Sequence, residues 1–176
     1  MKESKKVLDT RSGMWCIWNP KIAKGVNSYE DWEEKFYEDD SLLELIKEKL
    51  FVPINLQNNG ALEFIIRIAP QKTLSEREAK YLLTTSNNYL IESDGILNVS
   101  GIEYIEETIN ESHVAEVETA QNIYLVSIDI IDWKKEPGMT KEDGTPANGA
   151  LPDLIVHLNT PSNDAVISHK IETFRK

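Results

Sequence analysis

The sequence predicts an α+β fold that is mainly β: an antiparallel β-sandwich or barrel of about seven strands, with two short acidic helices near the N-terminus. Short runs in which apolar and polar residues alternate recur along the chain, as is typical of half-buried strands. Turn-forming residues separate these runs roughly every ten residues. Two stretches near the start have helical spacing instead, and the regular strand–helix alternation of a parallel α/β fold does not appear.

The composition is that of an ordinary globular domain. The chain has 176 residues, of which 40% are hydrophobic, and no repeat or break in composition marks a second domain. We therefore assign residues 1–176 to a single domain. We expect residues 1–11 and the loop 134–152 to be flexible.

The stretch GMWCIWNP predicts a strand from Gly13 to Trp18 that holds the only cysteine, Cys16. Alternation gives this thiol apolar neighbours on both faces, which do not activate a nucleophile, so we interpret Cys16 as a core residue. Trp15 and Trp18 point to opposite faces. The strand is either sandwiched between two layers, which we expect, or leaves an aromatic face for a partner.

Two acidic helices are predicted after this strand. Ser28 is a candidate N-cap for YEDWEEKFYE, in which Trp32 and Phe36 lie four residues apart on one face. Ser41, with Glu44 three residues later, predicts a capping box that starts LLELIKEKL. Acidic residues in these first turns also suit the positive end of a helix dipole.

The remaining strands follow from residue 61 onward. ALEFIIRIAP predicts a half-buried strand with Arg67 on its polar face, and DLIVHLNTP predicts another. SEREAKYLL fits either a short helix or a strand, and we favour a strand from Ala79. Asp94-Gly95 predicts a hairpin of residues 88–93 and 96–100. NIYLVSIDIIDW is the longest strand candidate, and AVISHKIETF is a candidate edge strand.

The charge distribution gives the clearest functional signal. The net charge is −11, and no Lys or Arg lies between Lys80 and Lys134 while acidic residues recur there. Such a surface disfavours nucleic acids and anionic membranes and suits a basic protein partner. The candidate partner-binding residues are Glu103, Glu106, Glu107, Glu111, Glu116 and Glu118.

Other chemistries are weakly supported. One cysteine cannot form an internal disulfide, the three histidines are far apart, and no phosphate-binding loop is present, so we expect no metal and no cofactor. Carboxylate pairs for acid–base catalysis are expected by chance among 30 acidic residues. Asp129 interrupts an apolar strand, and we interpret it as the polar side of a half-exposed strand. The basic start is interrupted by Asp9 before any apolar run of signal-peptide length, so we expect a cytoplasmic protein.

The stretch from Ala61 to Trp133 resembles the competence-protein J family, small nuclease inhibitors of Gram-positive bacteria. The resemblance lies in LEFIIRI, YLIESDGILNV, the glutamate-rich segment that follows, and IYLVSIDIIDW. It covers under half of the chain. The N-terminal strand, the two helices and the region after Asp153 have no counterpart that we can place. The resemblance implies a β-rich acidic protein that blocks a nuclease, or an immunity protein of similar type.

We therefore expect a non-enzymatic binding protein of inhibitor or immunity type, whose acidic face neutralises a basic nuclease or toxin. The alternative is a small-molecule-binding or hydrolytic β-sandwich with its site near the loop 136–152. That alternative predicts a pocket lined by Trp133 and a convergent carboxylate or histidine. A third possibility is a structural module that oligomerises through the aromatic N-terminal strand.

Overall fold

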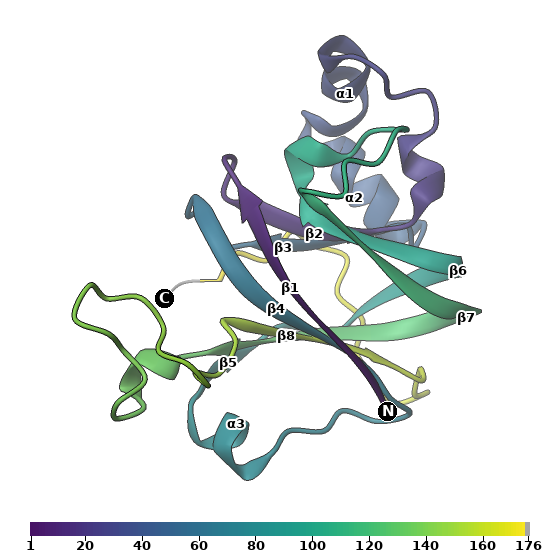
Figure 1. Cartoon of the computed structure of the whole chain (residues 1–176). Helices are drawn as coiled ribbons and strands as arrows, with labels where there is room; N and C mark the ends of the chain where they lie inside the picture. Colours follow the sequence, from purple (N-terminus) through teal and green to yellow (C-terminus); the bar gives the residue numbers. More distant parts are fainter. Residues whose placement is uncertain (175–176) are drawn as a thin grey trace.

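One mixed sheet dominates the computed structural model, which describes residues 1–174 (Figure 1). Within this range the eight strands are β1 Lys2–Thr10, β2 Met14–Trp18, β3 Phe51–Asn55, β4 Gly60–Ile68, β5 Leu82–Thr85, β6 Tyr89–Gly101, β7 Val114–Ile131 and β8 Leu154–Asn159. The helices are α1 Tyr29–Phe36, α2 Asp39–Lys47 and α3 Glu76–Lys80, with 3₁₀ turns η1 Pro20–Ala23, η2 Ile102–Tyr104 and η3 Trp133–Lys135. The β-rich fold class is confirmed.

The strand order is β1-β4-β8-β7-β6-β2-β3, and β5 pairs with β7 outside this path. All neighbours are antiparallel except β4 and β8, which run parallel from Phe64↔Leu154 to Ile68↔Leu158. The expectation of a purely antiparallel arrangement is therefore wrong. The physical reason is the long connection between β4 and β8, because a crossover of this length lets the returning strand run in either direction.

The sheet curls so that β1, at one edge, returns over β2 near the other edge (Figure 1). The Trp15 indole N–H on β2 donates to the Leu8 carbonyl on β1 at 3.1 Å. Among residues 1–174 no hydrogen-bonded ladder joins β1 to β3, so the sheet stays open. The main core fills the inside of this curl, and Trp15 packs there against Phe64 with ring centroids 6.1 Å apart.

Strand β2 is buried on both faces. Trp15 and Trp18 are 1% and 0% exposed, and the strand lies between β6 and β3. The expectation that the strand is sandwiched between two layers is confirmed. The third possibility, oligomerisation through an exposed aromatic face of this strand, therefore lacks the exposed face that it requires.

Helices α1 and α2 both begin with acidic residues in their first turn, and α1 also has a side-chain cap. Ser28 caps α1 in a reciprocal box with Asp31, as the sequence predicts for the cap. The box predicted at Ser41 is wrong, because α2 already begins at Asp39. The acidic first turn of α2 lies at the positive end of the helix dipole, which favours the earlier start.

The segment after β4 combines both conformations that the sequence allows. Ser75 and Glu78 form a capping box for α3, and β5 begins only at Leu82. The strand favoured from Ala79 is therefore wrong over its first residues. The side chain of Glu78 holds the helix in place through a buried ion pair with Arg67 on β4.

The hairpin predicted at Asp94-Gly95 is also wrong. Strand β6 continues through this dipeptide, which forms an irregularity in its pairing with β7, with a φ of 118° at Gly95. The 18-residue β7 pairs with β6 on both sides of the irregularity and so keeps it extended. A glycine that accepts positive φ serves a bulge as well as a turn.

The chain ends and loops also differ in part from the expected arrangement. We expect residues 1–11 to be flexible, and Lys2–Thr10 instead form β1, paired along its length with β4. No strand forms among residues 160–174, where only isolated bridges link Ile167 and Thr173 to the sheet. The loop after η3 extends away from the sheet at the left of Figure 1. No helix within residues 1–174 is long and apolar enough to cross a membrane.

Candidate functional site

The six candidate glutamates do not share one face. Glu103, Glu106 and Glu107 precede the turn that leads into β7 and lie near α1, whereas Glu116 and Glu118 lie on β7 beside the lysines of β1. Glu111 lies in the turn between these two groups. The fold thus separates residues that are close in sequence, because η2 and β7 lead the chain in different directions.

Lysines from distant segments neutralise part of the acidic stretch. Lys21 pairs with Asp94 at 2.9 Å, and Lys2 pairs with Glu118 at 3.4 Å. Lys21 and the Asn19 side chain both hydrogen-bond to Asp94, which lowers the pKa of that carboxyl. The negative face predicted between Lys80 and Lys134 is therefore smaller than its sequence suggests.

Glu103 has a structural role. Its carboxylate accepts hydrogen bonds from the Thr10 hydroxyl at 2.9 Å, the Ser12 hydroxyl at 2.8 Å and the backbone N–H of Arg11. These bonds hold the turn between β1 and β2 against η2. Its neighbour Glu106 is exposed, and its carboxylate makes no hydrogen bond or ion pair with residues 1–174.

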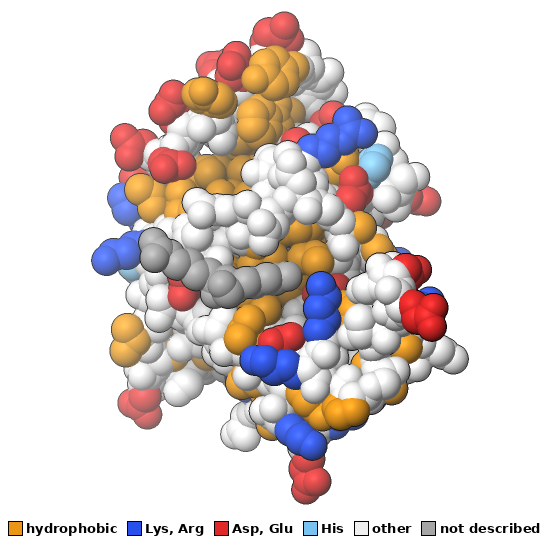
Figure 2. All heavy atoms as spheres, turned by 90° about the vertical axis from the view of Figure 1, so that its left-hand side faces the viewer, with side chains coloured by type: hydrophobic (Ala, Val, Ile, Leu, Met, Phe, Trp, Pro, Cys, Tyr) orange, Lys and Arg blue, Asp and Glu red, His pale blue; other side chains and the backbone are white. Residues whose placement is uncertain are grey.

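Exposed aromatic side chains lie next to Glu106. Tyr29 at the start of α1 and Tyr37 at its C-cap are 63% and 61% exposed. The Tyr29 ring stacks on Trp32, with centroids 6.0 Å apart, and the Trp32 indole N–H donates to the Ile102 carbonyl at 2.9 Å. Figure 2 shows acidic and hydrophobic side chains together at the top of the molecule, over α1. We call this region the α1 surface; it comprises Tyr29, Glu30, Trp32, Glu33, Glu34, Tyr37 and Glu106.

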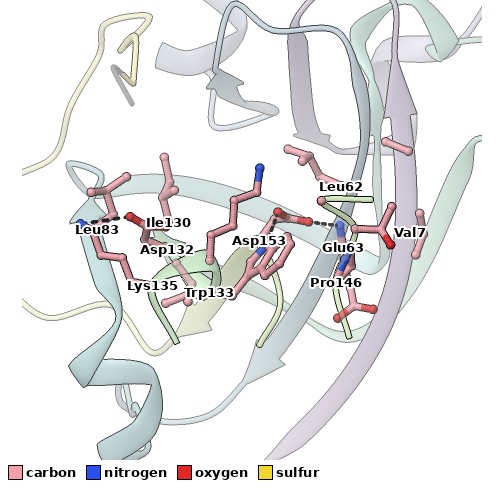
Figure 3. Close-up of a pocket in the computed structure, with 15 residues that line it drawn as sticks. Val7, Leu62, Glu63, Leu83, Ile130, Asp132, Trp133, Lys135, Pro146 and Asp153 are labelled. Carbon is pink, nitrogen blue, oxygen red and sulfur yellow. Dashed lines mark hydrogen bonds and ion pairs between the residues drawn. The ribbon is translucent and has the colours of Figure 1, made fainter. Parts of the chain in front are cut away.

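A pocket of about 670 Å³ lies at the other end of the sheet, beside the loop predicted as the alternative site (Figure 3). Its apolar walls include Leu62, Leu83 and Ile130, and Trp133 forms part of the lining. Pro146 from the loop borders it. The structure therefore contains the pocket that the alternative function requires.

The carboxylates of this pocket already have partners. Asp153 accepts from the Trp133 indole N–H at 2.8 Å and from the Glu63 backbone N–H at 2.9 Å, and Asp132 pairs with Lys135 at 3.1 Å. The hydrogen bond to Asp153 holds the Trp133 side chain in the lining of the pocket (Figure 3). The geometry suits binding of an apolar group, and the carboxylates of Asp153, Asp132 and Glu63 that line the pocket are already engaged in hydrogen bonds or ion pairs.

A cluster of buried polar side chains lies on the face of β7 and β8 that points away from the main core. Asp129 on β7 and His157 on β8 are both fully buried, with His157 Nε2 2.8 Å from the Asp129 carboxylate. The Thr85 hydroxyl donates to the same carboxylate at 2.6 Å, and the Lys72 ammonium pairs with it. Burial alone would raise the pKa of Asp129, but the hydrogen bonds from His157, Lys72 and Thr85 outweigh this effect and lower it.

This cluster is structural in character. An ionised Asp129 can only accept, so Nε2 of His157 donates to it, and Nδ1 of the same ring has no hydrogen-bond partner in residues 1–174. Beside it, Arg67 on β4 donates to both carboxylate oxygens of Glu78, at 2.8 and 3.2 Å, and to the Thr73 carbonyl. These bonds attach the segment that contains α3 to the sheet.

Cys16 is fully buried, and its burial raises the pKa of the thiol. Its sulfur lies 3.6 Å from the Ser100 carbonyl, and His157 bonds to Asp129 instead. The interpretation of Cys16 as a core residue agrees with this position. Within residues 1–174, no three His, Cys, Asp or Glu side chains lie together in a way that could hold a metal ion.

Neither a protein-family model nor a curated protein matches this chain. Two solved structures do. The crystal structure of ComJ from Bacillus subtilis, an inhibitor of the DNA-degrading activity of NucA, matches with a TM-score of 0.51 and 7% identity, over 90% of this chain and 96% of ComJ. The chain shares the fold of ComJ.

A second structure, described as crocagin biosynthetic gene J, matches with a TM-score of 0.57 and 16% identity, over 90% of this chain and 98% of that one. The likeness to ComJ is thus wider than the resemblance carried by Ala61 to Trp133, since it extends over 90% of the chain. At these identities the likeness concerns the fold.

Sequence reasoning missed the α1 surface and the buried cluster. The acidic residues of α1 are explained by helix capping alone, and nothing in the local sequence distinguishes the exposed tyrosines beside them from core residues. The sequence does carry a signal for the cluster, because Arg67 and Asp129 each interrupt an apolar strand, but the alternation there predicts a half-exposed Asp129. It is fully buried, because the segment from Lys72 to Thr85 covers that face of the sheet.

Proposed function

We propose that this protein is a non-enzymatic, acidic inhibitor or immunity protein that binds and neutralises a basic protein such as a nuclease or toxin. The observation that carries the proposal is the fold shared with ComJ, itself an inhibitor of a DNA-degrading activity. The net charge of −11 supports it, because a nuclease presents a basic cleft to DNA and an acidic surface complements such a cleft.

In this proposal residues 1–176 act as a single cytoplasmic domain without a cofactor. The segment with the six candidate glutamates contributes to the contact through Glu106, Glu111 and Glu116. These three are exposed, and they form no ion pair with other residues in the range 1–174.

The test is capture followed by an activity assay. The purified chain is immobilised, an extract of its native host is passed over it, and bound proteins are eluted with increasing salt and assayed for DNA degradation or toxicity. We expect a basic protein that elutes as salt screens the contact, and whose activity falls when the free chain is added back. An eluate without an activity that the chain suppresses would contradict the proposal.

The pocket beside Trp133 supports a second candidate function, which is binding of a small molecule with an apolar body. An NMR screen of small aromatic and aliphatic amines and carboxylic acids tests it through the Trp133 indole N–H signal. We expect saturable shifts of this signal, which Leu83→Arg abolishes by filling the mouth of the pocket. A screen in which this signal does not move would reject the candidate.

A further inference from the structure

We infer that the α1 surface is the docking site for the basic face of the partner, with Tyr29 and Tyr37 as its anchors. The inference rests on the proposed function and names the surface that performs it. It differs from the expectation based on the acidic segment, because most of the α1 surface lies outside residues 81–133.

The first argument is the exposure of the aromatic residues. Tyr29 and Tyr37 are the only exposed aromatic side chains among residues 1–174, and both lie at the ends of one short helix. Neither is needed to hold α1, which packs on the sheet through Phe36 and Trp32. Exposed tyrosines clustered around a fixed tryptophan have the composition of interface hot spots.

The second argument is charge that no lysine or arginine neutralises. None of the α1 acids Glu30, Glu33 and Glu34 forms an ion pair with residues 1–174, and neither does Glu106. The one lysine of α1, Lys35, instead donates to the Lys24 carbonyl. This contrasts with the acids of the β6–β7 region, where lysines from distant segments form ion pairs.

Helix stability does not explain all of these charges. Glu30 lies in the first turn of α1, where negative charge stabilises the helix dipole. Glu33 and Glu34 lie in its last turn, where negative charge is unfavourable. Glu33 also raises the pKa of Tyr29, mainly through its charge, and accepts a hydrogen bond from the Tyr29 hydroxyl at 3.4 Å.

The third argument is shape. A hollow of about 370 Å³ lies between α1 and the chain after η2, lined by Ser28, Tyr29, Trp32, Tyr37, Glu103 and Glu106. Aromatic walls with a carboxylate at the rim suit a long cationic side chain, whose methylene groups pack on the rings while its charge meets Glu106. We therefore assign this hollow to an arginine or lysine of the partner.

A second copy of this chain is a poor occupant, because two molecules that each carry a net charge of −11 repel one another. A basic protein gains from the same charge. The negative charge of this chain therefore favours a basic protein over a second copy as the occupant of the α1 surface.

One experiment uses a probe that does not depend on identifying the partner. An octa-arginine peptide is titrated into the ¹⁵N-labelled chain, and the backbone amide signals and the four Trp indole signals are followed by NMR. We expect the Trp32 signal to shift most and binding to weaken as salt rises. Shifts confined to β7 residues around Glu116, or no saturable shift, would overturn the inference whether or not a nuclease is captured.

The second experiment uses the captured partner. We expect Tyr29→Ala/Tyr37→Ala and Glu106→Gln each to weaken its binding, the double variant by at least tenfold. The matched controls are Val166→Ala and Glu142→Gln, at exposed positions away from the α1 surface; both should change the dissociation constant less than twofold. Melting temperatures verify folding, which alanine in an exposed helix preserves.

A captured nuclease that the α1 variants still bind as tightly as the wild type would refute the inference and leave the proposed function standing. Sedimentation provides the remaining outcome. A wild-type dimer that Tyr29→Ala/Tyr37→Ala converts to monomer would show that the surface binds a second copy, which also overturns the inference.

Discussion

Replacing Asp129 with asparagine should destabilise the protein more than any exposed carboxylate does. The carboxylate is fully buried and accepts from His157 at 2.8 Å, from Thr85 at 2.6 Å and from the Lys72 ammonium. An asparagine has similar shape but no charge, and its NH₂ group cannot accept. At least one of these donors then loses its partner inside the protein.

The expected magnitude follows from that count. Removing one partner of a buried, hydrogen-bonded charge pair costs about 3 kcal/mol in the free energy of unfolding. In a domain of this size such a loss lowers the melting temperature by about 6–12 °C. Urea unfolding at pH 7 and calorimetry measure both quantities. The matched control is Asp164→Asn, at an exposed position, for which we expect a change within about 0.5 kcal/mol.

The pH dependence gives this prediction its sign. Hydrogen bonding lowers the pKa of Asp129 in the folded protein, so the carboxylate contributes stability that is fully present above the pKa of the unfolded chain. That contribution is lost as the pH falls below about 4 and through the lower pKa of the folded state. The difference between wild type and Asp129→Asn should therefore shrink on acidification. Equal effects of the Asp129 and Asp164 variants at pH 7 would refute this account of the cluster.

Two further predictions concern buried groups. Cys16 should react with a thiol reagent at pH 8 only as fast as the chain unfolds, because burial both shields the thiol and raises its pKa; rapid reaction in the native state would contradict its core position. Arg67→Met should lower the free energy of unfolding by about 3 kcal/mol, because it leaves the Glu78 carboxylate buried without its cation. Adding Glu78→Gln should recover part of that loss in urea unfolding, because it removes the unpaired charge while its amide oxygen can still accept from the Ser75 N–H of the capping box. A double variant no more stable than Arg67→Met would show that the unpaired charge is not the cause.

The predictable parts of the fold are those set by neighbours in the sequence. The cap at Ser28, the alternation around Phe64 and the burial of Trp15 depend on residues within a few positions, and the structure agrees with each. The turn at Asp94-Gly95 was mispredicted because the same dipeptide serves a bulge once a long partner strand pairs with both of its sides. The local sequence is compatible with either a turn or a bulge, and the pairing of β6 with β7 decides in favour of the bulge.

The candidate site was predictable to a smaller extent. A pocket beside Trp133 follows from a long loop after a strand, and the structure contains one. The closeness of the six glutamates in the sequence predicts one shared face, but η2 and β7 place them in different regions of the structure. The tyrosines of α1 gain their significance from Glu106, which lies about 70 residues later in the chain and reaches them only through the fold.

The sequence alone establishes that this chain is acidic and β-rich, that its cysteine lies in a core strand, and that Ser28 caps α1. These properties depend on composition and on contacts between near neighbours. The tertiary structure decided which strands pair, which acids lysines neutralise, and which polar residues are buried. Those outcomes depend on contacts between distant segments, such as Lys72 with Asp129, and no local pattern encodes such contacts.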